Sequence, residues 1–158
     1  MTPLGAVEAS SLGQAMRQWL WLYPTVETIH IVGIALLFGS IAVLDLLLLG
    51  FSGSIPVTRL ARHVLPWTAA SFVLIVPSGL AMFTAHASEF VASPVFLLKI
   101  CLILAAGANA AVFHAGIFRS SRGWDVDAAP PAAARAAGAV SLALWISVIA
   151  CGRLLAYF

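Results

Sequence analysis

Three ionisable residues, Glu27, His30 and Asp45, interrupt the otherwise apolar run from Pro24 to Gly50. At about 1.5 Å per residue, a helix of this length exceeds the hydrocarbon core of a bilayer, which is about 30 Å thick. At about 100° per residue, the three side chains fall within about 60° on one face of that helix. A charge near the centre of a bilayer costs at least about 2.5 kcal/mol, so this face must point to protein or water.

Counting residues from the expected helix ends sorts the polar residues of the chain into two layers. The outer layer contains Glu27, His30, Lys99 and Arg153, with His86 at the outer end of the second span. The inner layer contains Asp45, Arg59, Arg62, His63, Asn109 and His114. Because His63 and His114 come at similar depths, we expect these two histidines to lie close together.

Two kinds of chemistry use histidines inside a membrane bundle. A b-type haem takes a neutral imidazole nitrogen as iron ligand, needs small residues beside its flat macrocycle, and places its propionates near basic side chains. Gly33 lies one turn from His30, and Ala110 and Ala111 lie one turn before His114, which leaves room beside each imidazole. Carboxylates and histidines in series through a bilayer form, alternatively, a proton or metal pathway.

Each candidate also has a structural explanation. His63 and His86 stand at helix ends, where a histidine is often just an interfacial polar residue. Lys99 and Arg153 are near enough to the helix ends to extend their charged groups to the membrane surface. Glu27 beside either cation would form a structural ion pair.

Composition places the whole chain in a membrane. Of its 158 residues, 62% are hydrophobic and 9% are charged, more apolar surface than a soluble domain of this size can bury. The eight Lys and Arg residues are scattered, without the basic run that nucleic-acid binding needs. Cys101 and Cys151 lie in apolar segments and imply no disulfide framework. We therefore expect the lipid bilayer, and not nucleic acid, as a partner.

The pattern of apolar runs predicts an all-α fold, an integral membrane four-helix bundle with a short N-terminal interfacial helix. Residues 1–158 form one domain, with spans at about 24–50, 58–85, 94–118 and 132–157. Residues 1–8 are expected to be extended or disordered. The interfacial helix should run from Ser10 or Ser11 to about Tyr23, with Trp19, Trp21 and Tyr23 at the membrane surface.

The basic residues of the loops predict the orientation. Arg59 and Arg62 flank the first connection, and Arg119, Arg122 and Arg135 flank the third, whereas the second connection has none. By the positive-inside rule the first and third connections are cytoplasmic. This interpretation places the protein in a bacterial cytoplasmic (inner) membrane, as a multi-pass protein with both termini outside.

Four runs of the sequence resemble a family of uncharacterised bacterial four-span membrane proteins. These runs are WLYPTVETIHIVGIALLFGSIAVLDLLLLG, RLARHVLPWTAASFVLIVPSGLAMF, SPVFLLKICLILAAGANAAVFH and LALWISVIACGRLLAYF. More distantly, the chain is similar to the CopD copper-resistance membrane domain and to HemJ-type protoporphyrinogen oxidases. The positions that match are His30 in the first span, Pro66 and Gly79 in the second, and Lys99 and His114 in the third. The resemblance implies a redox bundle that binds haem b.

Together these observations predict a haem-b-binding membrane protein for electron transfer or oxidoreduction, similar to a cytochrome b. The expected iron ligands are His63 with His114 at the inner side, and His30 with His86 or another partner at the outer side. Lys99 and Arg153 would meet the propionates, and Glu27 would neutralise these cations. A redox partner or quinone and a homo-oligomer are further partners that we consider.

Two other functions remain open at this stage. One is a small transporter or ion-translocating subunit for copper or protons, and the other is a non-catalytic membrane assembly subunit. Whether the protein is an enzyme is also left open by the sequence.

Overall fold

The computed structural model describes residues 2–51, 54–125, 129–155 and 157. Its elements, in chain order, are α1 (Pro3–Glu8), α2 (Ser11–Gln18), α3 (Leu22–Leu48), α4 (Val57–Ala85), α5 (Ala87–Ala92), α6 (Pro94–Ala115), the 3₁₀ helix η1 (Ile117–Gly123) and α7 (Ala132–Leu154). No strand occurs in these described ranges. The all-α fold is confirmed.

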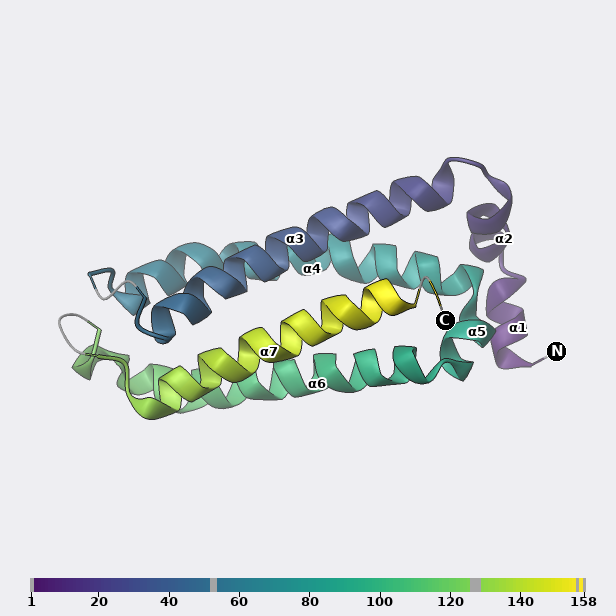
Figure 1. Cartoon of the computed structure of the whole chain (residues 1–158). Helices are drawn as coiled ribbons and strands as arrows, with labels where there is room; N and C mark the ends of the chain where they lie inside the picture. Colours follow the sequence, from purple (N-terminus) through teal and green to yellow (C-terminus); the bar gives the residue numbers. More distant parts are fainter. Residues whose placement is uncertain (1, 52–53, 126–128, 156, 158) are drawn as a thin grey trace.

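Four helices are long and apolar enough to cross a bilayer, and they confirm the four predicted spans. The shortest, α6, has 22 residues, which at about 1.5 Å per residue exceeds the roughly 30 Å of the hydrocarbon core. Both termini lie at one end of the bundle (Figure 1), as an even number of spans requires. We call this end the N-terminal end, and the opposite end, which carries η1, the η1 end.

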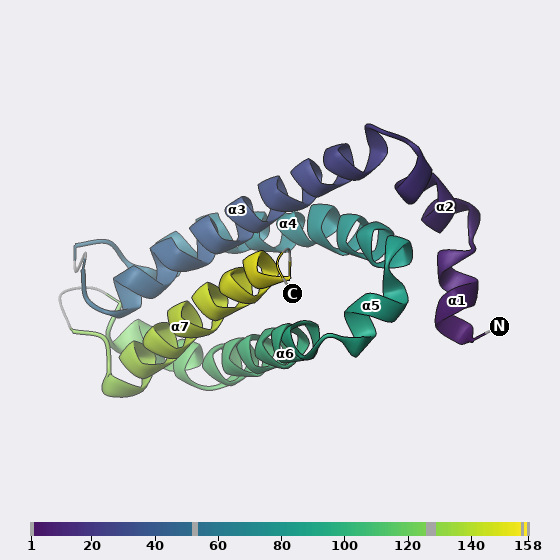
Figure 2. The ribbon, with the colours of Figure 1, turned by 45° about the vertical axis from the view of Figure 1, so that its right-hand side comes forward.

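The four spanning helices form two antiparallel hairpins, α3 with α4 and α6 with α7 (Figure 1). Helix α7 joins the hairpins because it packs against both α6 and α3. The backbones of α4 and α6 stay apart in the described structure, although their side chains meet, as where the Phe83 and Phe96 rings stack at 6.0 Å between centres. Instead, α5 connects the end of α4 to the start of α6 across the N-terminal end (Figure 2). The hairpins are therefore held together mainly by α7.

The apolar core lies at the η1 end. Its buried members come from all four spanning helices and are Leu44, Leu47, Leu48, Val57, Ala61, Val64, Phe113 and Ala134. Gly138 allows α7 to approach α3 here, because a Cβ atom at this position would lie 3.1 Å from the Asp45 backbone oxygen and 3.2 Å from the Leu48 Cβ. Small residues permit such close contacts between helices in membranes.

The N-terminal segment differs from the prediction, because residues 3–8 are helical and not extended. Thr2 caps α1 by accepting a hydrogen bond from the Gly5 N–H, and Pro3 occupies the first turn, where its missing N–H costs nothing. The predicted interfacial helix ends at Gln18, and Trp19 and Trp21 lie in the turn that follows. Both tryptophans are largely exposed, as expected of residues at a membrane surface.

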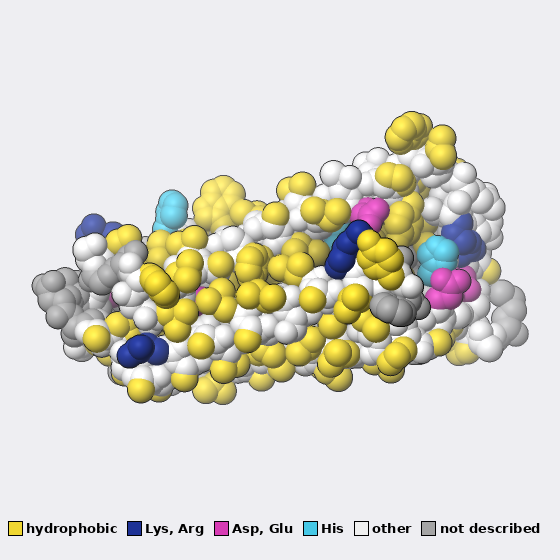
Figure 3. All heavy atoms as spheres, in the orientation of Figure 1, with side chains coloured by type: hydrophobic (Ala, Val, Ile, Leu, Met, Phe, Trp, Pro, Cys, Tyr) yellow, Lys and Arg dark blue, Asp and Glu magenta, His cyan; other side chains and the backbone are white. Residues whose placement is uncertain are grey.

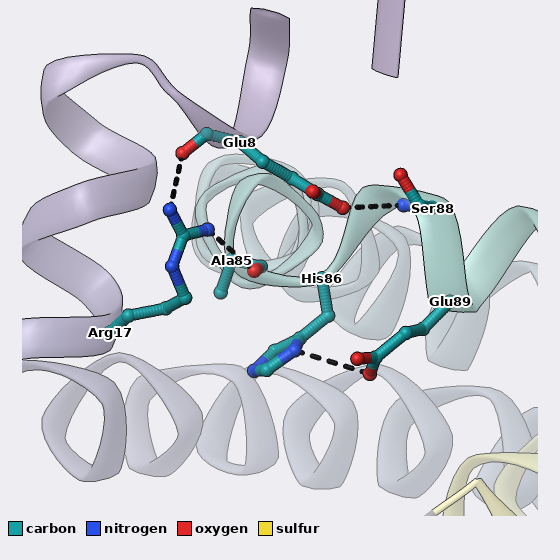
Figure 4. Close-up of polar contacts among 6 residues, drawn as sticks. All are labelled: Glu8, Arg17, Ala85, His86, Ser88 and Glu89. Atoms are coloured by element: carbon teal, nitrogen blue, oxygen red, sulfur yellow. Dashed lines mark hydrogen bonds and ion pairs between the residues drawn. The ribbon is translucent and has the colours of Figure 1, made fainter. Parts of the chain in front are cut away.

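Helices α1, α2 and α5 form a cap over the N-terminal end, which we call the N-terminal cap (Figure 4). Arg17 of α2 donates hydrogen bonds to the backbone oxygens of Ala85, at 2.8 Å, and of Glu8, at 2.6 Å. The Glu8 carboxylate accepts a 2.7 Å bond from the Ser88 N–H. These bonds satisfy free backbone groups at the end of α4 and the start of α5. They tie the N-terminal segment to α4 and α5.

Candidate functional site

His30 lies at the seam between α3 and α4, in the half of the bundle nearer the N-terminal end. Its Nδ1 atom is 3.1 Å from the Ile75 backbone oxygen and 2.9 Å from the Ser78 Oγ. The Ser78 hydroxyl itself donates to the Leu74 carbonyl. Both neighbours of Nδ1 therefore act as acceptors, so Nδ1 carries the proton and Nε2 keeps a free lone pair.

Gly79 gives the His30 ring its place against α4. A Cβ atom at Gly79 would lie 3.1 Å from the His30 Cε1 atom, which is closer than ordinary packing allows. Gly33, which the sequence suggested as the small neighbour of His30, faces Ile75 instead, and its missing Cβ would lie 2.7 Å from the Ile75 Cγ1. The residue that leaves room beside the imidazole is thus on the second span.

Charged residues surround this seam, and Figure 3 shows acidic, basic and histidine side chains gathered on the otherwise apolar surface near the N-terminal end. Lys99 of α6 and Glu27 of α3 are both close enough for their charges to act on His30. The Lys99 Nζ lies against α7, 3.6 Å from where a Cβ of Gly152 would be. The structure therefore brings together the predicted outer residues His30, Glu27 and Lys99.

The ion pairs expected in this layer do not form. Glu27 is exposed, and among the described residues the one ion pair is His86 with Glu89. The Arg153 guanidinium lies 4.7 Å from the centre of the Tyr157 ring and donates to the Tyr157 hydroxyl. The prediction that Glu27 would neutralise Lys99 or Arg153 is not met by direct contact.

His86 lies at the end of α4 and not beside His30. It caps the C-terminus of α4, seven residues or about 10 Å beyond Gly79, which contacts the His30 ring. Its Nδ1 is 3.2 Å from the Glu89 Oε2 (Figure 4), and its ring meets Tyr23 edge-on at 6.5 Å. Its surroundings match the interfacial explanation that the sequence left open.

A second site is a cavity of about 170 Å³ that lies between all four spanning helices, toward the η1 end. Its polar lining residues are Ser40, Asp45, Thr68, Asn109, His114 and Ser141. The Asp45 side chain lies beside Ser141 and is only 5% exposed, and its Oδ2 has no hydrogen-bond partner among the described residues. A buried carboxylate oxygen left without a partner is costly, which singles out this position.

His63 and His114 are not brought together in this cavity. His114 lines it and packs edge-on against Phe113 and Phe118, at 5.3 and 5.4 Å between ring centres. His63 is exposed on α4 and is not among the lining residues. Similar depth placed the two histidines in one layer, but depth does not determine which way each side chain points around its helix.

Asp45 was recognised in the sequence as an inner polar residue but not as a site residue. The sequence pattern does point to Asp45 as a site residue, because it shares a face of the first span with Glu27 and His30. Nothing in the sequence singles out its neighbour Ser141, because a lone serine in an apolar helix is common. The position of α7 against α3 is what makes the two residues neighbours.

The described part of the chain contains no group of three or more His, Cys, Asp or Glu side chains able to hold a metal ion. Cys101 is exposed and Cys151 is buried, and both are free thiols. Neither lies in a ligand cluster.

Comparisons with family models, curated proteins and solved structures give no match to this chain. The fold defines its class: a multi-pass α-helical membrane protein with four spans. Its function must be argued from the His30 seam and the central cavity.

Proposed function

We propose that this protein is a haem-b-binding membrane protein for electron transfer or oxidoreduction, with His30 as an iron ligand. The observation that carries the proposal is the position of His30 Nδ1 within hydrogen-bond distance of the Ile75 carbonyl and the Ser78 hydroxyl, which favours the tautomer with its lone pair on Nε2. Histidines that ligate metals generally donate their other ring N–H to a carbonyl or a similar acceptor. The chain supplies this arrangement inside a membrane span.

The surroundings of His30 support a flat anionic group. Gly79 removes a side chain beside the imidazole, and Lys99 and Arg153 provide cations from α6 and α7 for carboxylate groups such as propionates. The backbones of α4 and α6 stay apart within the described structure, which leaves this half of the bundle less tightly closed. A bound haem would supply one-electron chemistry, while the chain would hold the ligand and balance its charge.

The fit is to one histidine ligand in each chain. His86 lies seven residues, or about 10 Å, beyond Gly79 along α4. Its ring faces the Glu89 carboxylate. The cavity beside His114, at about 170 Å³, is smaller than the roughly 300 to 1,000 Å³ pockets that hold drug-sized ligands. We therefore do not assign a haem to His63, His114 or His86. A homo-oligomer, a redox partner or a quinone would complete the outer site.

The orientation in the membrane is part of this proposal. Five of the eight Lys and Arg residues, Arg59, Arg62, Arg119, Arg122 and Arg135, flank the connections at the η1 end. The positive-inside rule makes this end cytoplasmic and puts both termini outside. The resemblance to bacterial families supports the inner membrane of a bacterium as the location.

The test is the absorption spectrum of protein purified from cells supplied with haem precursor. We expect a Soret band and reducible α and β bands that are lost in His30→Ala and kept in His86→Ala. The second variant is a matched control because its histidine belongs to the same end of the bundle. A colourless wild-type protein that binds no added haemin would refute the proposal, as would unchanged pigment in His30→Ala.

A further inference from the structure

The central cavity is a site separate from the His30 seam. Asp45 and His30 are fifteen residues apart on α3, which separates them by about 22 Å along the helix. The cavity volume of about 170 Å³ leaves room for several water molecules, since one water occupies about 30 Å³ of liquid. Its hydroxyl, amide and carboxyl lining gives such waters hydrogen-bond partners.

Asp45 is the acidic group in this cavity. It is 5% exposed, its Oδ2 lacks a hydrogen-bond partner among the described residues, and Ser141 lies beside the same carboxyl group. A buried carboxylate without a cation is unstable unless water, a proton or a positive ion compensates it. No Lys or Arg is among the cavity-lining residues.

The other helices present few groups that could exchange charge with Asp45. Helix α6 contributes His114 and the amide of Asn109, whose Nδ2 donates to the Ala137 oxygen at 3.0 Å. The lining residues of α4 and α7 are uncharged, and their polar members are Thr68 and Ser141. His114 is therefore the second titratable residue of the lining.

We propose that Asp45 is a proton-exchange site inside the membrane. Its carboxylate takes a proton from a water-borne hydronium in the cavity, forming an O–H bond at the carboxyl group and leaving water, and it releases the proton by the reverse step. A metal ion fits less well, because it needs several converging oxygen ligands and the described part of the chain has no group of three or more His, Cys, Asp or Glu side chains able to hold one. This site makes the protein competent to accept protons within the bilayer.

The experiment measures the reaction of the protein in detergent with dicyclohexylcarbodiimide, which modifies protonated carboxyl groups in apolar surroundings. Mass spectrometry maps the labelled residue at a series of pH values, with sodium chloride or choline chloride present. We expect Asp45 to be labelled, at a rate that falls about tenfold per pH unit once the carboxyl is mostly ionised. Sodium should not change the rate.

Two variants serve as controls. Asp45→Asn should lose the label, whereas Glu27→Gln, which removes an exposed carboxyl of the same helix, should retain it. An infrared band of the protonated carboxyl that disappears at high pH in the wild type is a second readout, independent of whether Asp45→Asn folds. Absence of label and infrared band at every pH would overturn the proposal. If sodium but not choline protects Asp45 from the label, the proposal is wrong and the site binds a sodium ion instead of a proton. Neither outcome depends on whether haem is bound at His30.

Discussion

The two halves of this bundle hold their polar residues in different ways. Toward the η1 end, Asp45 is enclosed by four helices above a packed apolar core. Toward the N-terminal end, His30 is half-buried at a seam between two helices, and Glu27, one turn away, is exposed. One face of the first span therefore enters two environments.

The cause of this difference is the packing of α7. It approaches α3 closely at Gly138, beside Asp45, and closes the bundle there. At the other end the backbones of α4 and α6 stay apart within the described residues and meet through side chains such as Phe83 and Phe96, and the N-terminal cap lies across this end outside the spans. A single polar stripe in a membrane helix therefore does not define a single site. A closed half suits a small ion, and a more open half suits a larger ligand.

The largest expected effect tests the packing of the closed half. Leu48 is 2% exposed in the core, whereas Leu97 of α6, toward the N-terminal end, is 51% exposed. Leu48→Ala should destabilise the protein by about 2 kcal/mol, at the low end of the range for buried leucines. The loss is small because lipid or detergent solvates the leucine side chain in the unfolded state as well, so that mainly packing is lost. Leu97→Ala should cost much less. Thermal unfolding in detergent measures both, and equal losses would contradict the division into two halves.

A smaller effect concerns the cap that covers the open half. The Ser88 N–H and side chain, and the charge of Arg17 further away, hold the pKa of Glu8 below its ordinary value. A lowered pKa stabilises the folded state above the ordinary Glu value of about 4.3, and this contribution is lost as pH falls through the lower folded value.

Protease cleavage within residues 1–20 should therefore speed up as pH falls below about 4.3, and in Glu8→Gln it should be fast at every pH. Glu89→Gln is the matched control, since Glu89 is exposed and pairs with His86 instead of the N-terminal segment. If the cleavage rate of the wild type does not change with pH, the Glu8 carboxylate does not stabilise the cap.

The smallest expected effect is the coupling between Glu27 and Lys99. Glu27 is exposed and the two form no ion pair, so Glu27→Gln and Lys99→Met should have additive effects on thermal stability, within about 0.5 kcal/mol. A double-mutant cycle in detergent measures the coupling. A coupling well above 1 kcal/mol would mean that the open half closes around a buried pair, as the closed half does around Asp45.

Much of the fold was predictable from the sequence because it depends on local properties. The lengths of the apolar runs set the four spans, which begin and end within a few residues of the predicted limits. Proline and serine set helix starts, as where Ser93 accepts a hydrogen bond from the Phe96 N–H before α6. The short helices α1 and α5 were missed because brief polar segments carry little periodic signal.

The candidate site was less predictable, and the histidines show why. The sequence predicted that His30 lies in a span, with small residues of the same span near it. The residue against its ring, Gly79, comes from another helix. His63 and His114 share a depth, yet His63 is exposed while His114 faces a cavity. Depth follows from counting along a helix, whereas direction requires knowing which helices are neighbours.

What the sequence determined by itself was therefore the number of spans, their limits and the depth of each polar residue. The tertiary structure alone decided that α7 joins the two hairpins, that Asp45 and Ser141 line one central cavity and that Glu27 stays exposed. The physical reason lies in the solvent. In a bilayer, lipid and protein interior are equally apolar, so hydrophobic periodicity does not mark the buried face of a helix. The close fit of small residues such as Gly138 sets that face, and it appears only when the helices are packed together.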